Sequence, residues 1–276
     1  MQVRMSGDTR SSRVFRLATS SLRPLPDFVI FGAAKCGTTS MYDYLSRHPL
    51  VVPCRAKELH FADRPHNASR GASWYRSWFP TLQQLRRAGR AAGAERACCG
   101  EATPNYLSTP GAAATLRAVA PDVRLIALFR EPGDRSWSHY RMNRHERGTV
   151  ERFCADLQAD AARLAADVAA PQPDRTREYL RQSYYAPFLA EWLEAFPRDQ
   201  VLLLRSEDLF TRPDEACARV CAHLGLRAAD GPAFSTANEG RGDRVLPGEV
   251  RAWLDEHFAP YNARLAELTG GEITWP

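Results

Sequence analysis

The stretch Phe28-Val-Ile-Phe-Gly-Ala-Ala-Lys-Cys-Gly-Thr-Thr-Ser40 decides the fold of this chain. Its apolar run, Phe28 to Phe31, predicts a buried strand, and the glycine-bracketed segment from Gly32 to Gly37 predicts a loop. A helix is expected to begin near Thr38. A strand, a loop and a helix in this order direct backbone N–H groups and the positive end of the helix at one point, which is typical of a phosphate site.

The lysine of this loop is not where a nucleotide triphosphatase has it. The triphosphatase loop ends in Gly-Lys-Ser/Thr, whereas here Thr38 follows Gly37 and the lysine, Lys35, lies inside the loop. We therefore expect the loop to hold a phosphate-like group in a different register. The candidate contacts are Lys35, Cys36, Gly37, Thr38, Thr39 and Ser40.

The rest of the chain alternates short apolar runs with longer helical stretches, which favours an α/β fold with a central parallel sheet flanked by helices. The predicted strands are Phe28–Phe31, Leu50–Val52, Val123–Phe129 and Val201–Leu204. The predicted helices are Thr38–Arg47, Ser73–Trp78, Gly111–Val119, Arg135–Arg144, Cys154–Ala166, Arg177–Phe196, Pro213–Leu224 and Pro247–Leu268. Residues 1–25, rich in Arg and Ser, are expected to be a disordered basic tail, and residues 26–276 a single domain.

Composition narrows the classes of function. The chain has 276 residues and a formal net charge of +5, which suits an anionic ligand. It has no basic helix or zinc pattern that would indicate nucleic-acid binding. No stretch approaches the roughly 20 apolar residues of a membrane span. The seven cysteines are irregularly spaced, which argues against a disulfide framework.

A second candidate site follows the strand Val123–Phe129. Ligands of open α/β sheets bind beyond the carboxyl ends of strands, which is where Arg130 lies. A triphosphatase would place a magnesium-binding aspartate at such a strand end, so Arg130 indicates phosphate contact without a metal. Ser138, on the following helix, can direct its hydroxyl back to the same phosphate. The alternative is an arginine that caps the sheet edge and a serine that faces solvent.

Three blocks of this sequence resemble the motifs of sulfotransferases that use 3′-phosphoadenylyl sulfate (PAPS). They correspond to the 5′-phosphosulfate loop, the catalytic Glu-x-His segment and the 3′-phosphate motif, and they are Ala33–Thr39, Lys57–Asp63 and Phe129–Tyr140. The resemblance is closest to the glycan branch, with heparan sulfate and chondroitin-type enzymes. It extends through Thr103–Tyr106 and Ser183–Pro197 to the loop of Arg241 and Gly242. It implies the P-loop-like sulfotransferase fold.

The resemblance also implies a reaction and roles for residues. A sulfuryl group would pass from PAPS to a carbohydrate hydroxyl by in-line displacement, leaving PAP and requiring no metal. Lys35 would stabilise the leaving phosphate, and Glu58 would be the general base. His60 would orient Glu58, bind substrate or act as base itself, and Asp63 matches a third position that matters in relatives. Contacts to the 3′-phosphate are implied for Arg130, Ser138, Arg241 and Gly242.

Several alternatives remain open at this point. Thr39 and Ala102 stand where heparan-type relatives often carry basic residues, which argues against heparan sulfate specifically. A carbohydrate hydroxyl is the expected acceptor, and a small-molecule hydroxyl is the alternative. A P-loop nucleotide kinase and a catalytically silent nucleotide-binding module are the other classes. Arg135, Arg141, Arg144 and Arg147 would either line a cleft for an acidic substrate or form a solvated helix face. The sequence as written predicts a soluble cytoplasmic protein, and the Golgi lumen is the alternative if a native membrane anchor is missing.

Overall fold

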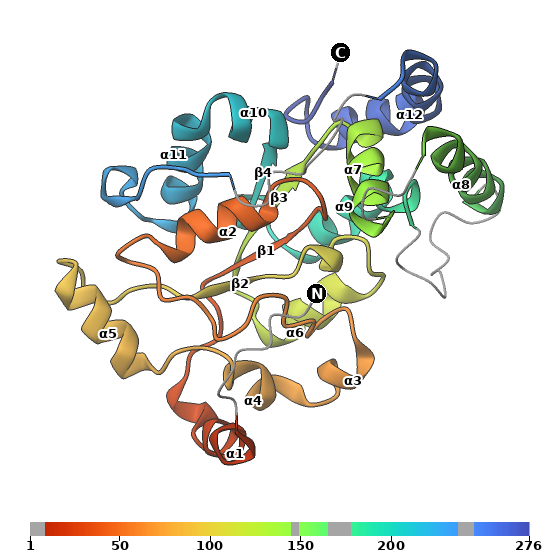
Figure 1. Cartoon of the computed structure of the whole chain (residues 1–276). Helices are drawn as coiled ribbons and strands as arrows, with labels where there is room; N and C mark the ends of the chain where they lie inside the picture. Colours follow the sequence, from red (N-terminus) through yellow and green to blue (C-terminus); the bar gives the residue numbers. More distant parts are fainter. Residues whose placement is uncertain (1–8, 145–148, 165–177, 237–245, 276) are drawn as a thin grey trace.

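The computed structural model describes residues 9–144, 149–164, 178–236 and 246–275 (Figure 1). Its centre is a parallel sheet with the strand order β2-β1-β3-β4. The strands are β1 (Phe28–Gly32), β2 (Gly100–Ala102), β3 (Arg124–Phe129) and β4 (Val201–Arg205). The predicted α/β fold with a central parallel sheet is therefore confirmed.

Helices surround the sheet. The α-helices of the described residues are α1 (Arg10–Ala18), α2 (Thr38–Ser46), α3 (Pro65–Ala68), α4 (Gly71–Arg76), α5 (Leu82–Ala91), α6 (Ala112–Val119), α7 (Pro132–Arg144), α8 (Val150–Leu164), α9 (Tyr185–Ala195), α10 (Ser206–Thr211), α11 (Pro213–Leu224) and α12 (Gly248–Leu268). The 3-10 turns are η1 (Ser20–Leu22), η2 (Pro104–Tyr106), η4 (Arg181–Ser183), η5 (Arg198–Gln200) and η6 (Ala228–Asp230). No helix within these described ranges is long and apolar enough to cross a membrane.

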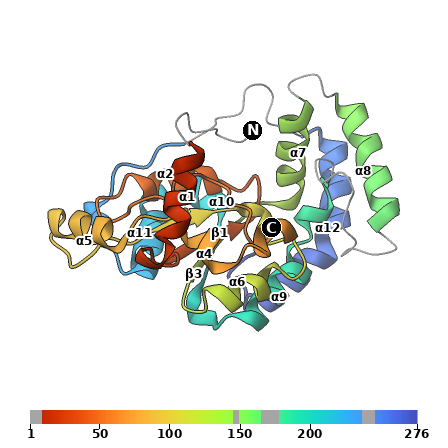
Figure 2. The same cartoon turned by 90° about the horizontal axis from the view of Figure 1, so that it is seen from below.

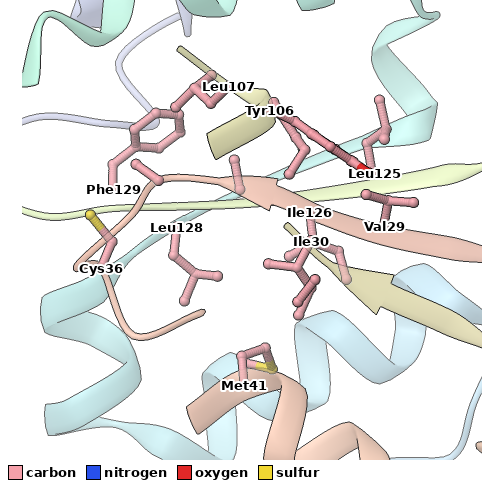
Figure 3. Packing of buried hydrophobic residues seen from close by; sticks show 14 of the residues in the cluster. Val29, Ile30, Cys36, Met41, Tyr106, Leu107, Leu125, Ile126, Leu128 and Phe129 are labelled. Carbon is pink, nitrogen blue, oxygen red and sulfur yellow. The ribbon is translucent and has the colours of Figure 1, made fainter. Parts of the chain in front are cut away.

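The two faces of the sheet are both covered, which explains why its strands are apolar almost throughout. Figure 3 shows Met41 of α2 on the side of Ile30 and Leu128, and Leu107 on the opposite side of the sheet. On that opposite side the ring of Trp192, from α9, lies 4.3 Å from the ring of Phe31. Since successive residues of a strand face opposite sides, β1 packs against both layers.

The order of the strands positions the site. The chain passes from β1 outward to β2 and then returns to the other side of β1, where it forms β3. The connections therefore leave β1 and β3 in different directions, and the carboxyl ends of these two central strands form the crevice in which open α/β sheets bind ligands. The loop of Lys35 follows β1 and Arg130 follows β3.

Two predicted elements differ in the structure. Leu50–Val52 is not a strand, since Val51 forms only an isolated bridge with Cys98. The helix predicted for Arg177–Phe196 begins only at Tyr185 in its described part, after the turn η4. Pro187 is compatible with this later start, because proline lacks an N–H and is tolerated only in the first turn of a helix.

The expected disorder of residues 1–25 is wrong for the part that the structure describes, residues 9–25. Helix α1 begins after Thr9, whose hydroxyl caps it by accepting the N–H of Ser12. Arg16 is buried against Trp78, with its guanidinium 5.8 Å from the ring centre, and Arg23 donates to the carbonyl of Phe79 at 2.6 Å. Buried arginines fix this segment, and hydrophobic periodicity gives no signal for such contacts.

Candidate active site

The loop between β1 and α2 has the backbone that a phosphate site needs. Gly37 is the N-cap of α2 and has a φ of 85°, which is a left-handed conformation that glycine adopts readily. Lys35 also has a positive φ, of 73°. A Cβ on Gly32 would lie 2.5 Å from the Cβ of Leu107, so the chain can approach η2 closely only with glycine there. The first turn of α2 leaves N–H groups without partners inside the helix.

Cationic side chains surround Lys35. Burial lowers the pKa of Lys35, and the positive charges of Arg135, Arg130 and Lys57 lower it further. Its ammonium lies 3.4 Å from the sulfur of Met142, on α7. A cluster of like charges is unfavourable in itself, so this arrangement is suited to an anion that neutralises several of them.

Arg135 departs furthest from what the sequence predicted. Its side chain neither lines a cleft nor lies on a solvated helix face. Its side chain is completely buried on α7 and donates to the carbonyl of Ala34, inside the loop, at 3.1 Å. Its other acceptors are uncharged: the carbonyl of Tyr179, the hydroxyl of Ser183, the side-chain oxygen of Gln182 and Nδ1 of His139. Burial and the adjacent Arg135 hold the pKa of His139 well below its usual range, so that ring is neutral. Arg135 thus places a positive charge beneath the loop.

Arg130 follows β3 as predicted and lies close enough to Lys35 to lower its pKa. Its guanidinium is partly exposed and lies 3.7 Å from the carboxylate of Asp134. Its carbonyl accepts a hydrogen bond of 2.9 Å from the hydroxyl of Tyr185, which also lies 3.7 Å from the thiol of Cys36. The ends of β1 and β3 are therefore tied together below the loop. Ser138 lies on α7 and is partly exposed.

The segment of Glu58 lies against the carboxyl end of β2. The N–H of Glu58 donates to the carbonyl of Ala102 at 3.1 Å. Lys57 connects this segment to the phosphate loop, because its ammonium donates to the hydroxyl of Thr39 and lies 3.8 Å from the carboxylate of Glu58. The side chain of Glu58 is 46% exposed. Its carboxylate is therefore accessible to a substrate.

His60 is fixed by a buried carboxylate. Its Nδ1 lies 2.8 Å from Oδ2 of Asp63, a residue that is 3% exposed. With Nδ1 held by Asp63, Nε2 lies on the side of Glu58, whose nearer carboxylate oxygen is 3.9 Å away. The amide of Asn67 donates to the carbonyl of His60 at 2.9 Å and holds the main chain from the other side.

The structure thus brings several of the predicted residues into one region. Hydrogen bonds, ion pairs and charge effects, some of them through Lys57, connect Lys35, Thr39, Glu58, His60, Asp63 and Arg130. Cys36 differs, because its thiol is buried in the core, burial raises its pKa to about 11, and its N–H donates to the carbonyl of Ala33. Ser40 is also buried. Arg241 and Gly242 lie outside the described residues.

Lys57 and Arg135 were missed as site residues. Lys57 stands next to Glu58 in the sequence, and this adjacency was the available signal. Arg135 gave no such signal, because its burial depends on the distant segment that contains Tyr179 and Gln182. Within the described ranges, no group of three or more His, Cys, Asp or Glu side chains is arranged to hold a metal ion.

Comparison with known proteins identifies the class. The family model described as "Sulfotransferase domain" matches residues 25–239, and the chain belongs to this family. The resemblance predicted from the three sequence blocks and the P-loop-like sulfotransferase fold are therefore confirmed. The phosphate loop, the Glu58 segment and Arg130 all lie within the matched range.

Individual relatives agree with this assignment. The chain is 27% identical over 277 residues to heparan sulfate glucosamine 3-O-sulfotransferase 3A1 of Mus musculus, covering 92% of this chain and 65% of that protein. It is 28% identical over 276 residues to heparan sulfate glucosamine 3-O-sulfotransferase 6 of Homo sapiens, with 92% and 74% covered. A solved sulfotransferase from Alicyclobacillus acidocaldarius has a TM-score of 0.69 at 28% identity, over 91% of this chain and 98% of that one. The chain spans about two thirds of the length of the first relative.

Proposed function

We propose that this protein transfers a sulfuryl group from PAPS to a hydroxyl group of a carbohydrate. One observation carries the proposal: Lys57 contacts both Thr39 of the phosphate loop and the carboxylate of Glu58. A leaving-group site and a proton acceptor are thus adjacent. In-line displacement of a sulfuryl group requires these two functions on opposite sides of the transferred group.

The residues around the loop fit an anionic donor such as PAPS. PAPS supplies a sulfuryl group attached to a phosphate that can leave. Lys35 and the amides of the first turn of α2 would hold that phosphate and stabilise the negative charge that grows on it. Arg135 adds a buried positive charge without a carboxylate acceptor in the contacts described above. Arg130 with Ser138 would bind the 3′-phosphate, and Arg241 and Gly242 remain candidates for the same role.

Glu58 would remove the proton of the acceptor. Its carboxylate is half exposed, so an acceptor hydroxyl can reach it, and proton removal by a positioned carboxylate increases rates by about 10²–10⁴. His60, held by Asp63, would keep Glu58 in place or contact the acceptor. Lys57 would hold the carboxylate of Glu58 close to the hydroxyl of Thr39 in the loop. Cationic side chains supply the charge stabilisation, so the proposal includes no divalent metal.

The names of the relatives favour a glycosaminoglycan acceptor, since both curated relatives quoted above are named as heparan sulfate glucosamine 3-O-sulfotransferases. The proposal therefore places a glycan in the acceptor position. A small-molecule hydroxyl uses the same donor site and the same base, so an acceptor panel separates the two.

The test is transfer of labelled sulfate from PAPS to desulfated heparan sulfate, desulfated chondroitin and simple phenols, with EDTA present. We expect transfer to a glycan, and Glu58→Gln is expected to lower kcat by about 100-fold or more while the affinity for PAP stays unchanged. Glu95→Gln, at an exposed site, is the matched control and should keep full activity. Transfer that needs a divalent cation, transfer to phenols alone, or a Glu58→Gln variant with normal kcat contradicts the proposal.

A further inference from the structure

We propose that Glu101, in β2, is a positioning residue that holds the Lys57–Phe61 segment in its active geometry through the hydroxyls of Thr103 and Tyr106. The inference rests on the proposed roles of Glu58 and His60. The hydrogen bonds described for Glu101 are with Tyr75, Thr103 and Tyr106, and not with the loop of Lys35 or with Glu58. Glu101 acts through two side chains that hydrogen-bond the main chain of the segment.

Glu101 is a completely buried carboxylate surrounded by hydroxyl groups. Its Oε1 accepts hydrogen bonds from Tyr75 and Tyr106, both at 2.8 Å, and its Oε2 accepts one from Thr103 at 2.5 Å. Burial raises the pKa of Glu101, and these three hydrogen bonds act in the opposite direction. Burial of a carboxylate among neutral donors costs more free energy than burial of an apolar side chain of similar size. This indicates a role other than packing.

The two hydroxyls that donate to Glu101 also accept from the catalytic segment. The hydroxyl of Tyr106 accepts the N–H of Phe61 at 2.8 Å, and that of Thr103 lies 3.5 Å from the N–H of His60. Because each hydroxyl proton is directed at Glu101, the lone pairs of each hydroxyl face the segment. Glu101 therefore sets the orientation of two acceptors, and these acceptors set the position of the main chain.

The segment needs such support because its backbone is unfavourable. Glu58 has a φ of 60° and His60 a φ of 53°, which is the left-handed region that residues with a side chain rarely adopt. Such conformations persist only where the surroundings hold them. The N–H of Glu58, bound to Ala102, and the carbonyl of His60, bound to Asn67, supply two of the contacts. Asn67 also donates to the carbonyl of Leu59 at 3.4 Å, and Glu101 acts on two further contacts through Thr103 and Tyr106.

Tyr75 and Tyr106 offer a matched pair of variants. Each hydroxyl donates to the same oxygen of Glu101 at the same distance. The ring of Tyr75 stacks on Phe61, and this ring remains in Tyr75→Phe, but of the two hydroxyls it is that of Tyr106 that accepts an N–H of the segment. Both Tyr75→Phe and Tyr106→Phe are expected to lower the melting temperature by similar amounts. Tyr106→Phe alone is expected to lower kcat by about 10-fold or more, because a small displacement of reacting groups is enough for such a loss. The Kd for PAP should change by less than about threefold in both variants.

Glu101 itself is tested with a residue of the same shape. A glutamine at this position has only one acceptor oxygen, so Glu101→Gln cannot accept from all three hydroxyls. We expect it to lower kcat with an unchanged Kd for PAP. Thr103→Val is expected to behave in the same way, and Thr103→Ser, which keeps the hydroxyl, should restore most of the activity. These milder variants test the inference even if Glu101→Gln does not fold.

Two results would overturn the inference. One is equal loss of kcat in Tyr75→Phe and Tyr106→Phe, because the network would then act only on general stability. The other is normal kcat in folded Tyr106→Phe and Thr103→Val. Glu58→Gln distinguishes these failures from failure of the proposed function: if Glu58→Gln is inactive while the network variants are normal, only the role of Glu101 is wrong. If Glu58→Gln is fully active, the assignment of the base is wrong, and the inference fails with it.

Discussion

Lys35 shows how neighbours define a candidate site residue. Its place in a glycine-bounded loop is visible in the sequence, and in the structure it is partly buried among Arg130, Arg135 and Lys57. Desolvation and like charges both disfavour its charged form, so the pKa of Lys35 is lower than that of a free lysine. An anion that binds beside Lys35 would stabilise the charged form of this lysine. The strength of binding should therefore depend on the protonation of this one side chain.

This dependence gives a prediction for alkaline pH. PAP should bind the protonated form of Lys35, so affinity is present below the pKa of Lys35 and is lost as the pH rises through it. Since that pKa is lowered from 10.5, the loss should begin at a lower pH than it would for an exposed lysine. Calorimetric titration with PAP from neutral to alkaline pH measures the effect. Lys35→Arg is the control and should have a flatter profile because arginine stays charged. Parallel profiles for the two proteins would contradict the prediction.

At the level of elements, the short strand β2 is decisive and was not predicted. It has three residues, one of them charged, and it carries no apolar run. Pairing with β1 makes it a strand, and its position brings Glu101, Thr103 and the Glu58 segment together. The other three strands were predictable, because each contains an apolar run that is mostly buried. Leu50–Val52 has the same appearance in sequence but forms a single bridge.

The close approach of β2 to β1 predicts the effect of one substitution. A Cβ on Gly100 would lie 2.5 Å from the carbonyl oxygen of Phe28, and this backbone atom cannot move away cheaply. Gly100→Ala is therefore expected to lower the free energy of unfolding by about 1–3 kcal/mol, measured by thermal or urea denaturation. Gly248→Ala is the control, because nothing lies within 4 Å of its Cβ position. Equal stability of the two variants would show that the sheet accommodates the methyl group.

The candidate site was predictable where it depends on chain order. Lys35 and Arg130 follow strands, so the rule for strand ends in parallel sheets locates both. Glu58 and His60 were located by their motif, but their left-handed backbone and its supports were not. Arg135 could not be distinguished from an exposed arginine, since three of its acceptors come from residues 44 to 48 positions later in the chain and one from the loop of Lys35. Contacts of this kind are set by tertiary packing.

At the scale of the whole molecule, the C-terminal helix contacts residues beside the candidate donor site. Figure 2 shows α12 beside α7, at the end of the molecule where α8 also lies. Arg251 of α12 forms ion pairs with Asp134 and, at 3.3 Å, with Glu131. Asp134 is also the carboxylate that lies 3.7 Å from Arg130. Arg251 therefore competes for an acidic group that would otherwise neutralise Arg130.

Removal of the Arg251 side chain should weaken the binding of PAP. In Arg251→Ala, Asp134 is expected to pair more closely with Arg130, so the Kd for PAP should rise by about threefold to tenfold. The kcat at saturating PAPS should be unchanged, because Arg251 is remote from the acceptor side. Arg264→Ala is the control: Arg264 is exposed and pairs with Glu267 on the same helix. An unchanged Kd in Arg251→Ala would mean that Asp134 does not respond to the loss of its partner.

The buried guanidinium of Arg135 has a consequence for the lifetime of the protein. Burial of this cation among neutral acceptors costs free energy in the ligand-free protein. An anion bound at the loop would interact favourably with its charge and offset part of that cost. Ligands that bind only the native state raise the free energy of unfolding in proportion to the logarithm of their concentration. If PAPS binds here as proposed, the resistance of this protein to heat and to proteolysis rises with the supply of that nucleotide in its surroundings.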